Sequence, residues 1–274
     1  MVIKMIVVDM DGTFLNDNKQ YNHDRFNRLF KKMEALKIRF VVASGNQYFQ
    51  LRSFFPDIYQ SITFIAENGA NIVIGDQSFY NASLAKMTVT NTLNLLQDLQ
   101  PINLIVCGKN SAYILEGSTN EQLDVAKFYY PKIKVLASWE NLYNEKDDIL
   151  KFALSFNDKD ITTKLKILKN VLGNTLIPVS SGHGDIDLIV PGIHKYHGLQ
   201  LLSKEWQISE DEIAAFGDSG NDFEMIKYIK HSFAMENAQT EIKQVAKETI
   251  GSNNSESLLD IIEKIINEAI KCAH

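Results

Sequence analysis

The chain has 274 residues, 45% of them hydrophobic, and a formal net charge of -6. This length and apolar content suffice for a sizeable core, in one large domain or two smaller ones. The mild acidity argues against nonspecific binding to nucleic acid, and an anionic substrate would need local positive charge or a metal ion in its site.

The cysteines and the apolar stretches predict the cellular compartment of the protein. Cys107 and Cys272 show no motif spacing, so we expect reduced thiols and no structural disulfide. No apolar stretch is long enough to cross a bilayer, and no signal peptide is recognised. We therefore expect a cytoplasmic protein with no nucleic-acid or membrane partner. The sequence does not indicate an oligomeric state.

The first predicted strand leads into two aspartates. Residues 5–15 have the sequence MIVVDMDGTFL, and the apolar run before Asp9 is typical of a strand buried on both faces in a parallel sheet. Asp9 and Asp11 follow at its carboxyl end, where open α/β sheets place their ligands. Two carboxylates on one side of an extended chain repel each other unless a cation or a proton intervenes. By themselves they could equally cap a turn.

The next segments predict a βαβ unit. An amphipathic helix over His23–Leu36 is followed by an apolar strand, Arg39–Ala43, which points to a parallel sheet. Ser44 and Gly45 end this strand at the same edge as Asp9. A hydroxyl and backbone N–H groups before a helix are suited to binding phosphate, although Ser44 could also be a simple helix cap. Asn68, after a third strand, is either a turn residue or a substrate contact.

The middle of the chain changes pattern. From about Leu84 to Gly182, paired strands and helices replace the strand–helix alternation, which predicts an inserted α+β domain with an antiparallel sheet. We therefore expect a Rossmann-like parallel-sheet core of residues 1–83 and 183–274, with residues 84–182 inserted. The strand Asp187–Val190 is expected to return to the core.

Two further segments add charge to the predicted sheet edge. Lys195 begins an amphipathic helix, where the helix dipole disfavours a cation; it is either a solvated surface residue or a partner of a bound anion. The apolar strand Glu212–Phe216 ends in GDSGND. One side chain would suffice as a cap, so the excess of Asp218, Asn221 and Asp222 favours a hard cation such as Mg²⁺.

Taken together, these motifs resemble those of the haloacid dehalogenase-like hydrolases. DMDGT at Asp9–Thr13 matches the first motif of that family, Ser44 the second, Lys195 the third and GDSGND at Gly217–Asp222 the fourth. The insertion is similar to the α+β cap of the Cof-type subgroup, and the closest resemblance is to bacterial sugar phosphatases of the SupH/YbiV kind. Asn46 stands where many relatives carry arginine.

The resemblance implies a role for each of these residues. Asp9 would attack phosphorus and form an aspartyl-phosphate, and Asp11 would act as general acid and base. Mg²⁺ would be held by the Asp9 and Asp218 carboxylates and the Asp11 carbonyl oxygen. The phosphoryl group would be bound by Ser44, Lys195 and Asn221 and by backbone N–H groups of Met10 and Gly45. Asp222 would support the metal site or orient Lys195.

The expected function is therefore Mg²⁺-dependent hydrolysis of small phosphorylated metabolites, foremost sugar phosphates. One alternative is a phosphotransferase or phosphomutase acting on sugars, since Asp11 could serve a hydroxyl acceptor as well as water. A second alternative is a non-enzymatic switch with a phosphorylated aspartate. Asp11 argues against the switch, because a general base beside the acyl phosphate would shorten its lifetime.

Overall fold

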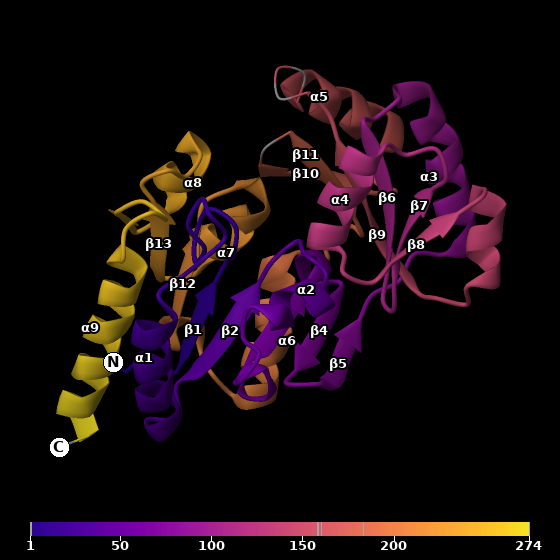
Figure 1. Cartoon of the computed structure of the whole chain (residues 1–274). Coiled ribbons are helices and arrows are strands. Elements are labelled where there is room, and N and C mark those ends of the chain that lie inside the picture. The colour runs from indigo at the N-terminus through magenta and orange to yellow at the C-terminus, as the bar shows by residue number, and fades with distance from the viewer. Residues whose placement is uncertain (1, 158, 160, 183, 274) are drawn as a thin grey trace.

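Two β-sheets, each flanked by helices, make up the molecule (Figure 1). The computed structural model describes residues 2–157, 159, 161–182 and 184–273. The eight-stranded core sheet comes from both ends of the chain, and the six-stranded sheet, here called the cap, comes from the middle. The predicted α/β class, with a parallel core and an inserted α+β part, is confirmed.

The core sheet has the strand order β14-β13-β12-β1-β2-β3-β4-β5. The strand β1 is parallel to β2 on one side and to β12 on the other, with Val7 opposite both Val41 and Ala215. All four β1 residues are fully buried, which explains the unbroken apolar run. The strands are β1 Met5–Val8, β2 Arg39–Ala43, β3 Thr63–Ala66, β4 Asn71–Ile74, β5 Gln77–Asn81, β12 Ile213–Gly217, β13 His231–Met235 and β14 Glu248–Ile250.

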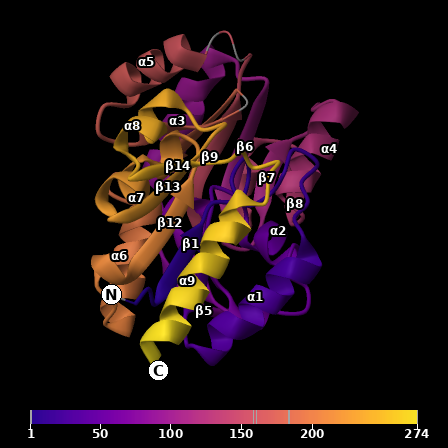
Figure 2. The ribbon, with the colours of Figure 1, turned by 90° about the vertical axis from the view of Figure 1, so that its left-hand side faces the viewer.

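Helices cover both faces of the core sheet, as Figure 2 shows. On one face α1 packs against α9, while α6 and α7 lie together on the other. In α1 the buried side chains are Phe26, Leu29, Phe30 and Met33, the stripe expected from its sequence. The core helices are α1 His23–Ala35, α2 Tyr48–Ser53, α6 Lys195–Trp206, α7 Phe223–Tyr228, α8 Thr240–Val245 and α9 Ser257–Ala273.

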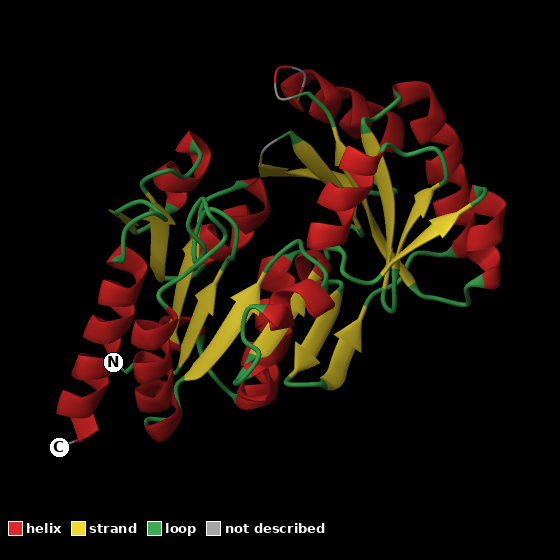
Figure 3. Cartoon of the chain, viewed as in Figure 1, coloured by secondary structure: helices red, strands yellow, loops and turns green. Residues whose placement is uncertain are grey.

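The cap sheet has the order β10-β11-β9-β6-β7-β8, and Figure 3 shows its strands flanked by helices. Its pairs are antiparallel except β7 with β8, which is parallel. The cap elements are α3 Lys86–Leu99, β6 Asn103–Gly108, β7 Ala112–Leu115, α4 Asn120–Tyr129, β8 Ile133–Leu136, β9 Ile149–Ser155, α5 Ile161–Leu172, β10 Ile177–Gly182 and β11 Asp185–Ile189.

The two faces of the cap sheet differ in character because side chains alternate along each strand. One face carries Phe152 and Leu154 and packs against α3 and α5. The other face carries Ile105, Cys107 and Ala153, which pack against α4. Lys151 and Ser155 of β9 share the register of Ala153, so this second face is also partly polar.

One predicted boundary is wrong. Residues 183–189 are expected from the sequence to lie in the core, but β11 lies in the cap sheet, antiparallel to both β10 and β9. Ile186 and Leu188 pack in the cap core, so the apolar run that suggested a core strand is buried in the other sheet. The boundary residue His183 lies outside the described residues, and the chain leaves the cap sheet after Ile189.

The short elements β8, α8 and β14 were not expected from the sequence. Each is short, and β8 carries charge within it, so its periodicity is weak. Among the helices that the structure describes, none has the length and apolar character needed to span a membrane.

Candidate active site

The ends of β1, β2 and β12 bring the predicted residues to one edge of the core sheet. Because β1 lies between the other two strands, Asp9, Ser44 and Asp218 follow three neighbouring strands. The backbone N–H of Asp9 still donates to Phe216 O at 3.1 Å, and that of Ser44 to Ile65 O at 2.9 Å. The site is therefore built directly on the ends of the central, hydrogen-bonded strands of the core sheet.

Lys195 is the cationic centre of this edge. It is the first residue of α6 and is fully buried, so it is not a solvated surface residue. Its Nζ lies 2.6 Å from Asp9 Oδ1 and 2.7 Å from Asp222 Oδ1. Burial lowers the pKa of Lys195, but the Asp222 and Asp9 carboxylates more than offset this and raise it above its usual value. The ammonium group is therefore charged and orients Asp9.

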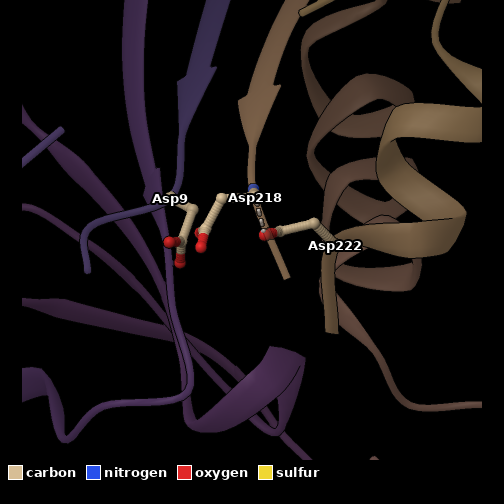
Figure 4. Close-up of side chains that lie close together, drawn as sticks. All are labelled: Asp9, Asp218 and Asp222. Atoms are coloured by element: carbon tan, nitrogen blue, oxygen red, sulfur yellow. Dashed lines mark hydrogen bonds between the residues drawn. The ribbon is translucent and has the colours of Figure 1, made fainter. Parts of the chain in front are cut away.

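The carboxylates of Asp9, Asp218 and Asp222 lie close together at this edge and are called here the acidic corner. Figure 4 shows the carboxylates of Asp9 and Asp218 side by side, with Asp222 extending toward them. Ligand atoms of all three lie within 4.8 Å of one another. Burial raises the pKa of Asp9 well above its ordinary range, partly offset by Lys195. Burial and Asp222 raise the pKa of Asp218 to about 7. Such repulsion is what a divalent cation would relieve.

The three carboxylates are not equally suited to holding a cation. Asp222 Oδ2 already accepts from the backbone N–H groups of Asp218 and Ser219 at 3.0 and 3.1 Å, and its Oδ1 binds Lys195. Asp218 accepts one side-chain hydrogen bond at Oδ1, from Thr13 at 3.0 Å. Asp9 and Asp218 therefore fit a hard cation, while Asp222 acts as their support.

Gly12 makes room for Asp218. Its φ is +74°, and a Cβ there would lie 2.6 Å from Asp218 Oδ2. Any other residue would be strained in its backbone and would also displace this carboxylate. The glycine of the first motif is thus required by the geometry of the acidic corner.

Asp11 is held by two donors that the sequence analysis did not assign. Lys19 Nζ forms an ion pair with Asp11 Oδ1, and Asn46 Nδ2 donates to Asp11 Oδ2 at 2.6 Å. Asn46 therefore contacts Asp11. Lys19 also lies 5.8 Å from the ring centroid of Tyr129 in α4 of the cap. Neither residue belongs to a motif, so spacing gave no indication of either contact.

The residues predicted to bind phosphate lie around the same edge. Ser44 is buried, and its Oγ accepts from the Asn46 backbone N–H at 3.2 Å. Asn221 Oδ1 accepts from Ser219 Oγ at 2.8 Å, and Asn221 Nδ2 donates to Asn68 Oδ1 at 3.0 Å. The Met10 side chain is in the hydrophobic core, so only its backbone can serve a ligand.

A pocket joins this edge to the polar face of the cap. Its core wall includes Asp9, Asp11, Ser44, Gly45 and Asn221. The cap wall comes from β6, α4, β9 and β11, and consists of Asn103, Ile105, Val125, Ala126, Tyr129, Tyr130, Lys151, Ala153, Ser155, Asp185 and Asp187. A ligand that reaches Asp9 would therefore also contact the cap.

A buried charged group at the junction of core and cap is absent from the sequence analysis. Lys151 of the cap lies 2.8 Å from Asp187 Oδ1 and 3.5 Å from Glu67 Oε2 of the core. All three side chains are almost completely buried. The indication in the sequence was a charged residue inside each apolar strand, LKFAL and DIDLI, since charged residues are seldom fully buried without partners.

Glu67 provides a test of this group through the pH dependence of stability. Burial raises the pKa of Glu67 to about 7 from 4.5, partly offset by Lys151. A carboxyl whose pKa is higher in the folded state binds more protons there, so stability falls as pH rises from 4.5 through 7. From this pKa difference, Glu67 should contribute a loss of about 3 kcal/mol across that range.

In Glu67→Gln this contribution is absent, so the variant should gain about 3 kcal/mol relative to wild type between pH 4.5 and pH 8. Denaturant unfolding at a series of pH values measures the difference. Glu210→Gln, an exposed carboxyl, serves as the control. A difference between Glu67→Gln and wild type that stays constant with pH would contradict the raised pKa.

Comparison with known proteins shows which family and which proteins this chain is similar to. A family model described as haloacid dehalogenase-like hydrolase matches residues 6–262. The chain is 44% identical over 266 residues to a protein of Escherichia coli (strain K12) named 5-amino-6-(5-phospho-D-ribitylamino)uracil phosphatase YbjI, with 97% of each chain covered.

Solved structures agree with this match. SMU.1108c from Streptococcus mutans UA159 has a TM-score of 0.91 and 34% identity, over 97% of this chain and 99% of that one. The sugar phosphatase BT4131 has a TM-score of 0.78 at 17% identity, over 95% and 98% of the two chains, and so shares the fold.

Proposed function

Since the chain belongs to the haloacid dehalogenase-like hydrolases, we propose that it is a Mg²⁺-dependent phosphomonoesterase acting on small phosphorylated metabolites, foremost sugar phosphates. The family resemblance found in the sequence is confirmed, and the relative with 44% identity is named as a phosphatase. The observation that carries the proposal is the pairing of buried Lys195 with Asp9, which lines the pocket.

In the proposed first step, a carboxylate oxygen of Asp9 attacks phosphorus in line, and the bond from phosphorus to the ester oxygen breaks. Asp11 transfers a proton to the departing alkoxide. In the second step Asp11 takes a proton from water, which attacks phosphorus and releases phosphate from Asp9. Lys19 and Asn46 each donate to the Asp11 carboxyl and hold it in place beside the phosphorus.

Lys195 and the loop residues hold the nucleophile and the phosphoryl group in place during both steps. The Lys195 ammonium holds Asp9 in place, and Ser44, Asn221 and the backbone of Met10 and Gly45 are proposed to bind the phosphoryl oxygens. A divalent cation at Asp9, Asp218 and the Asp11 carbonyl would neutralise negative charge between nucleophile and substrate. Catalysis then depends mainly on positioning and charge stabilisation.

The cap wall supports a hydroxyl-rich leaving group. Asn103, Ser155 and Asp185 offer hydrogen-bonding groups on one face of the cap sheet, and Tyr129 offers a ring beside them. The name of YbjI specifies a phosphate ester of a ribityl chain attached to a uracil, which has both hydroxyl groups and a flat ring. We therefore extend the proposed substrates from sugar phosphates to phosphorylated polyols of this kind.

Phosphate release from a panel of sugar phosphates, nucleotides and 5-amino-6-(5-phospho-D-ribitylamino)uracil, with Mg²⁺ and with EDTA, tests the proposal. We expect metal-dependent release with preference for sugar or polyol esters. Transfer to an added sugar in excess of release would favour a phosphotransferase. A stable phosphorylated protein without turnover would favour a switch, and either result would contradict the proposal.

Asp218→Asn tests the metal site separately from activity. The variant loses one of the two carboxylates suited to the cation, so we expect Mg²⁺ affinity measured by calorimetry to fall at least tenfold, about 1.4 kcal/mol. Asp211→Asn, which alters a half-buried carboxylate paired with Lys230 away from the site, is the control. Unchanged Mg²⁺ affinity in Asp218→Asn would remove Asp218 from the proposed ligands.

A further inference from the structure

We propose that Asp187 of the cap is a positioning residue for Asn221, acting through Asn68, so that docking of the cap completes the phosphate site. This inference rests on the proposed function, because it takes Asn221 as a phosphate ligand. Asn68 Nδ2 donates to Asp187 Oδ2 at 2.6 Å, and Asn68 Oδ1 accepts from Asn221 Nδ2 at 3.0 Å. One amide thus joins the cap to the last motif of the core.

The charge of Asp187 sets the direction of every bond in this chain. A carboxylate only accepts hydrogen bonds, so Asn68 must turn its NH₂ group toward Asp187. The carbonyl oxygen of Asn68 then faces Asn221, which must also present NH₂. The oxygen of Asn221 is left for Ser219 Oγ, at 2.8 Å. The NH₂ group of Asn221 has two hydrogens, and Asn68 uses one, which leaves a donor for a phosphoryl oxygen.

The hydrogen-bonded series Asp187, Asn68 and Asn221, here called the relay, is shielded from water. This shielding strengthens the preferred orientation of each hydrogen bond. Asp187, Asn68 and Asn221 are at most 8% exposed, and hydrogen bonds to a charged group are stronger in such surroundings. Lys151 balances Asp187 from within the cap, 2.8 Å from its other oxygen. Rotating the Asn68 amide would place two oxygens against each other beside a buried charge.

The core backbone is shaped for this contact. Glu67 and Asn68 have φ of 51° and 54°, an uncommon conformation for residues other than glycine. Asn68 N–H donates to Ser44 O at 3.0 Å, so the strained turn is fastened to the second motif. A Cβ on Gly45 would lie 2.9 Å from Asp187 Oδ2 and 3.2 Å from Asn68 Oδ1. Strain and a close approach at one place are typical of a functional contact.

When the cap moves away, Asn68 loses the group that fixes its orientation, and Asn221 loses its own constraint. The phosphate site is then complete only with the cap in place, so cleavage is favoured when the leaving group is enclosed. The neighbouring core–cap contact, in which Gln47 exchanges two 3.1 Å hydrogen bonds with the Lys132 backbone, holds the cap without touching Asn221.

A mutant cycle tests the relay. Asp187→Asn keeps the side-chain volume but removes the fixed polarity, and we expect a loss of at least about tenfold in kcat/KM and in affinity for inorganic phosphate measured by calorimetry with Mg²⁺. In an Asn221→Ala background the same substitution should change either quantity by less than about twofold, because the residue it acts through is gone.

Two further variants separate positioning from other effects. Asn68→Gly removes the amide of the relay, and glycine readily adopts the positive φ, so the variant should fold. Like Asp187→Asn, it should lower phosphate affinity when Asn221 is present and have little effect in the Asn221→Ala background. Asp185→Asn is the matched comparison: Asp185 lies two residues along the same strand in the same pocket, but accepts from Ser155 of the cap at 2.6 Å. Any effect of Asp185→Asn should be equal in both backgrounds.

An effect of Asp187→Asn that persists undiminished in Asn221→Ala would overturn the relay and would indicate direct contact with the leaving group or a purely structural role. Unchanged phosphate affinity in both Asp187→Asn and Asn68→Gly would also overturn it. Failure of wild type to release phosphate would instead contradict the proposed function, and the phosphate-affinity cycle would still decide the relay.

Discussion

Replacement of Asp9 by asparagine is expected to abolish turnover, with kcat at least about 10⁴-fold below wild type, as is typical when a nucleophile is removed. The amide has nearly the same shape, and its oxygen can still accept from Lys195, so the geometry of the corner is retained. An amide is a far weaker nucleophile than a carboxylate. The loss should therefore appear in kcat, while affinity for inorganic phosphate changes much less.

Although Asp9→Asn should lose activity, it should not lose stability. Burial raises the pKa of Asp9, and the nearby Asp222 and Asp218 oppose its ionisation, so a neutral side chain relieves repulsion. We expect a Tm equal to or above that of wild type, measured by circular dichroism beside kcat. Asp211→Asn is the control for both measurements. More than about 1% of wild-type activity, a hundredfold or smaller loss, would exclude Asp9 as the nucleophile.

Lys195→Met is expected to have the largest effect on stability. The ammonium group is fully buried and pairs with Asp9 and Asp222 at 2.6 and 2.7 Å. Methionine fills a similar volume but leaves two buried carboxylates without their cation. Removing one partner of a buried pair typically costs about 3–5 kcal/mol. Denaturant unfolding at pH 7 without metal measures this loss, and activity should be lost as well.

Two additions distinguish charge imbalance from poor packing. Asp222→Asn in the Lys195→Met background removes one unpaired charge and should recover part of the stability. Mg²⁺ should also stabilise this variant, because a ligand that binds only the folded state raises its free energy of unfolding. Lys230→Met removes an exposed lysine that pairs with Asp211 at the surface, and should cost at most about 1 kcal/mol. A loss in Lys195→Met as small as that of this control would contradict the buried-pair assignment.

Contacts between the cap and the core connect the active site to the cap. Each wall of the pocket belongs to a different sheet, and the bonds that cross between the sheets involve buried amides and charges. The proposed relay and the acidic corner share one element, the loop that carries Asp218 and Asn221. A change at the cap would therefore reach the phosphate site through hydrogen bonds rather than through movement of the core strands.

The sequence by itself determined the edge of the core sheet. A fully buried parallel strand needs an unbroken apolar run, and polar residues placed directly after such runs must meet at one edge. Asp9, Ser44 and Asp218 follow from this rule without further information. Lys195 needed the resemblance to a family as well, since a lysine at a helix start is by itself ambiguous.

Only the tertiary structure decided which sheet some strands join and which distant side chains meet. An apolar run looks alike in either sheet, so β11 was assigned to the core although its partners are β9 and β10. The contacts of Asp11 with Asn46, and of Asp187 with Asn68, join residues 35 and 119 positions apart. No periodicity encodes such pairs, because they depend on how two separately formed sheets dock, which is settled by packing over the whole interface.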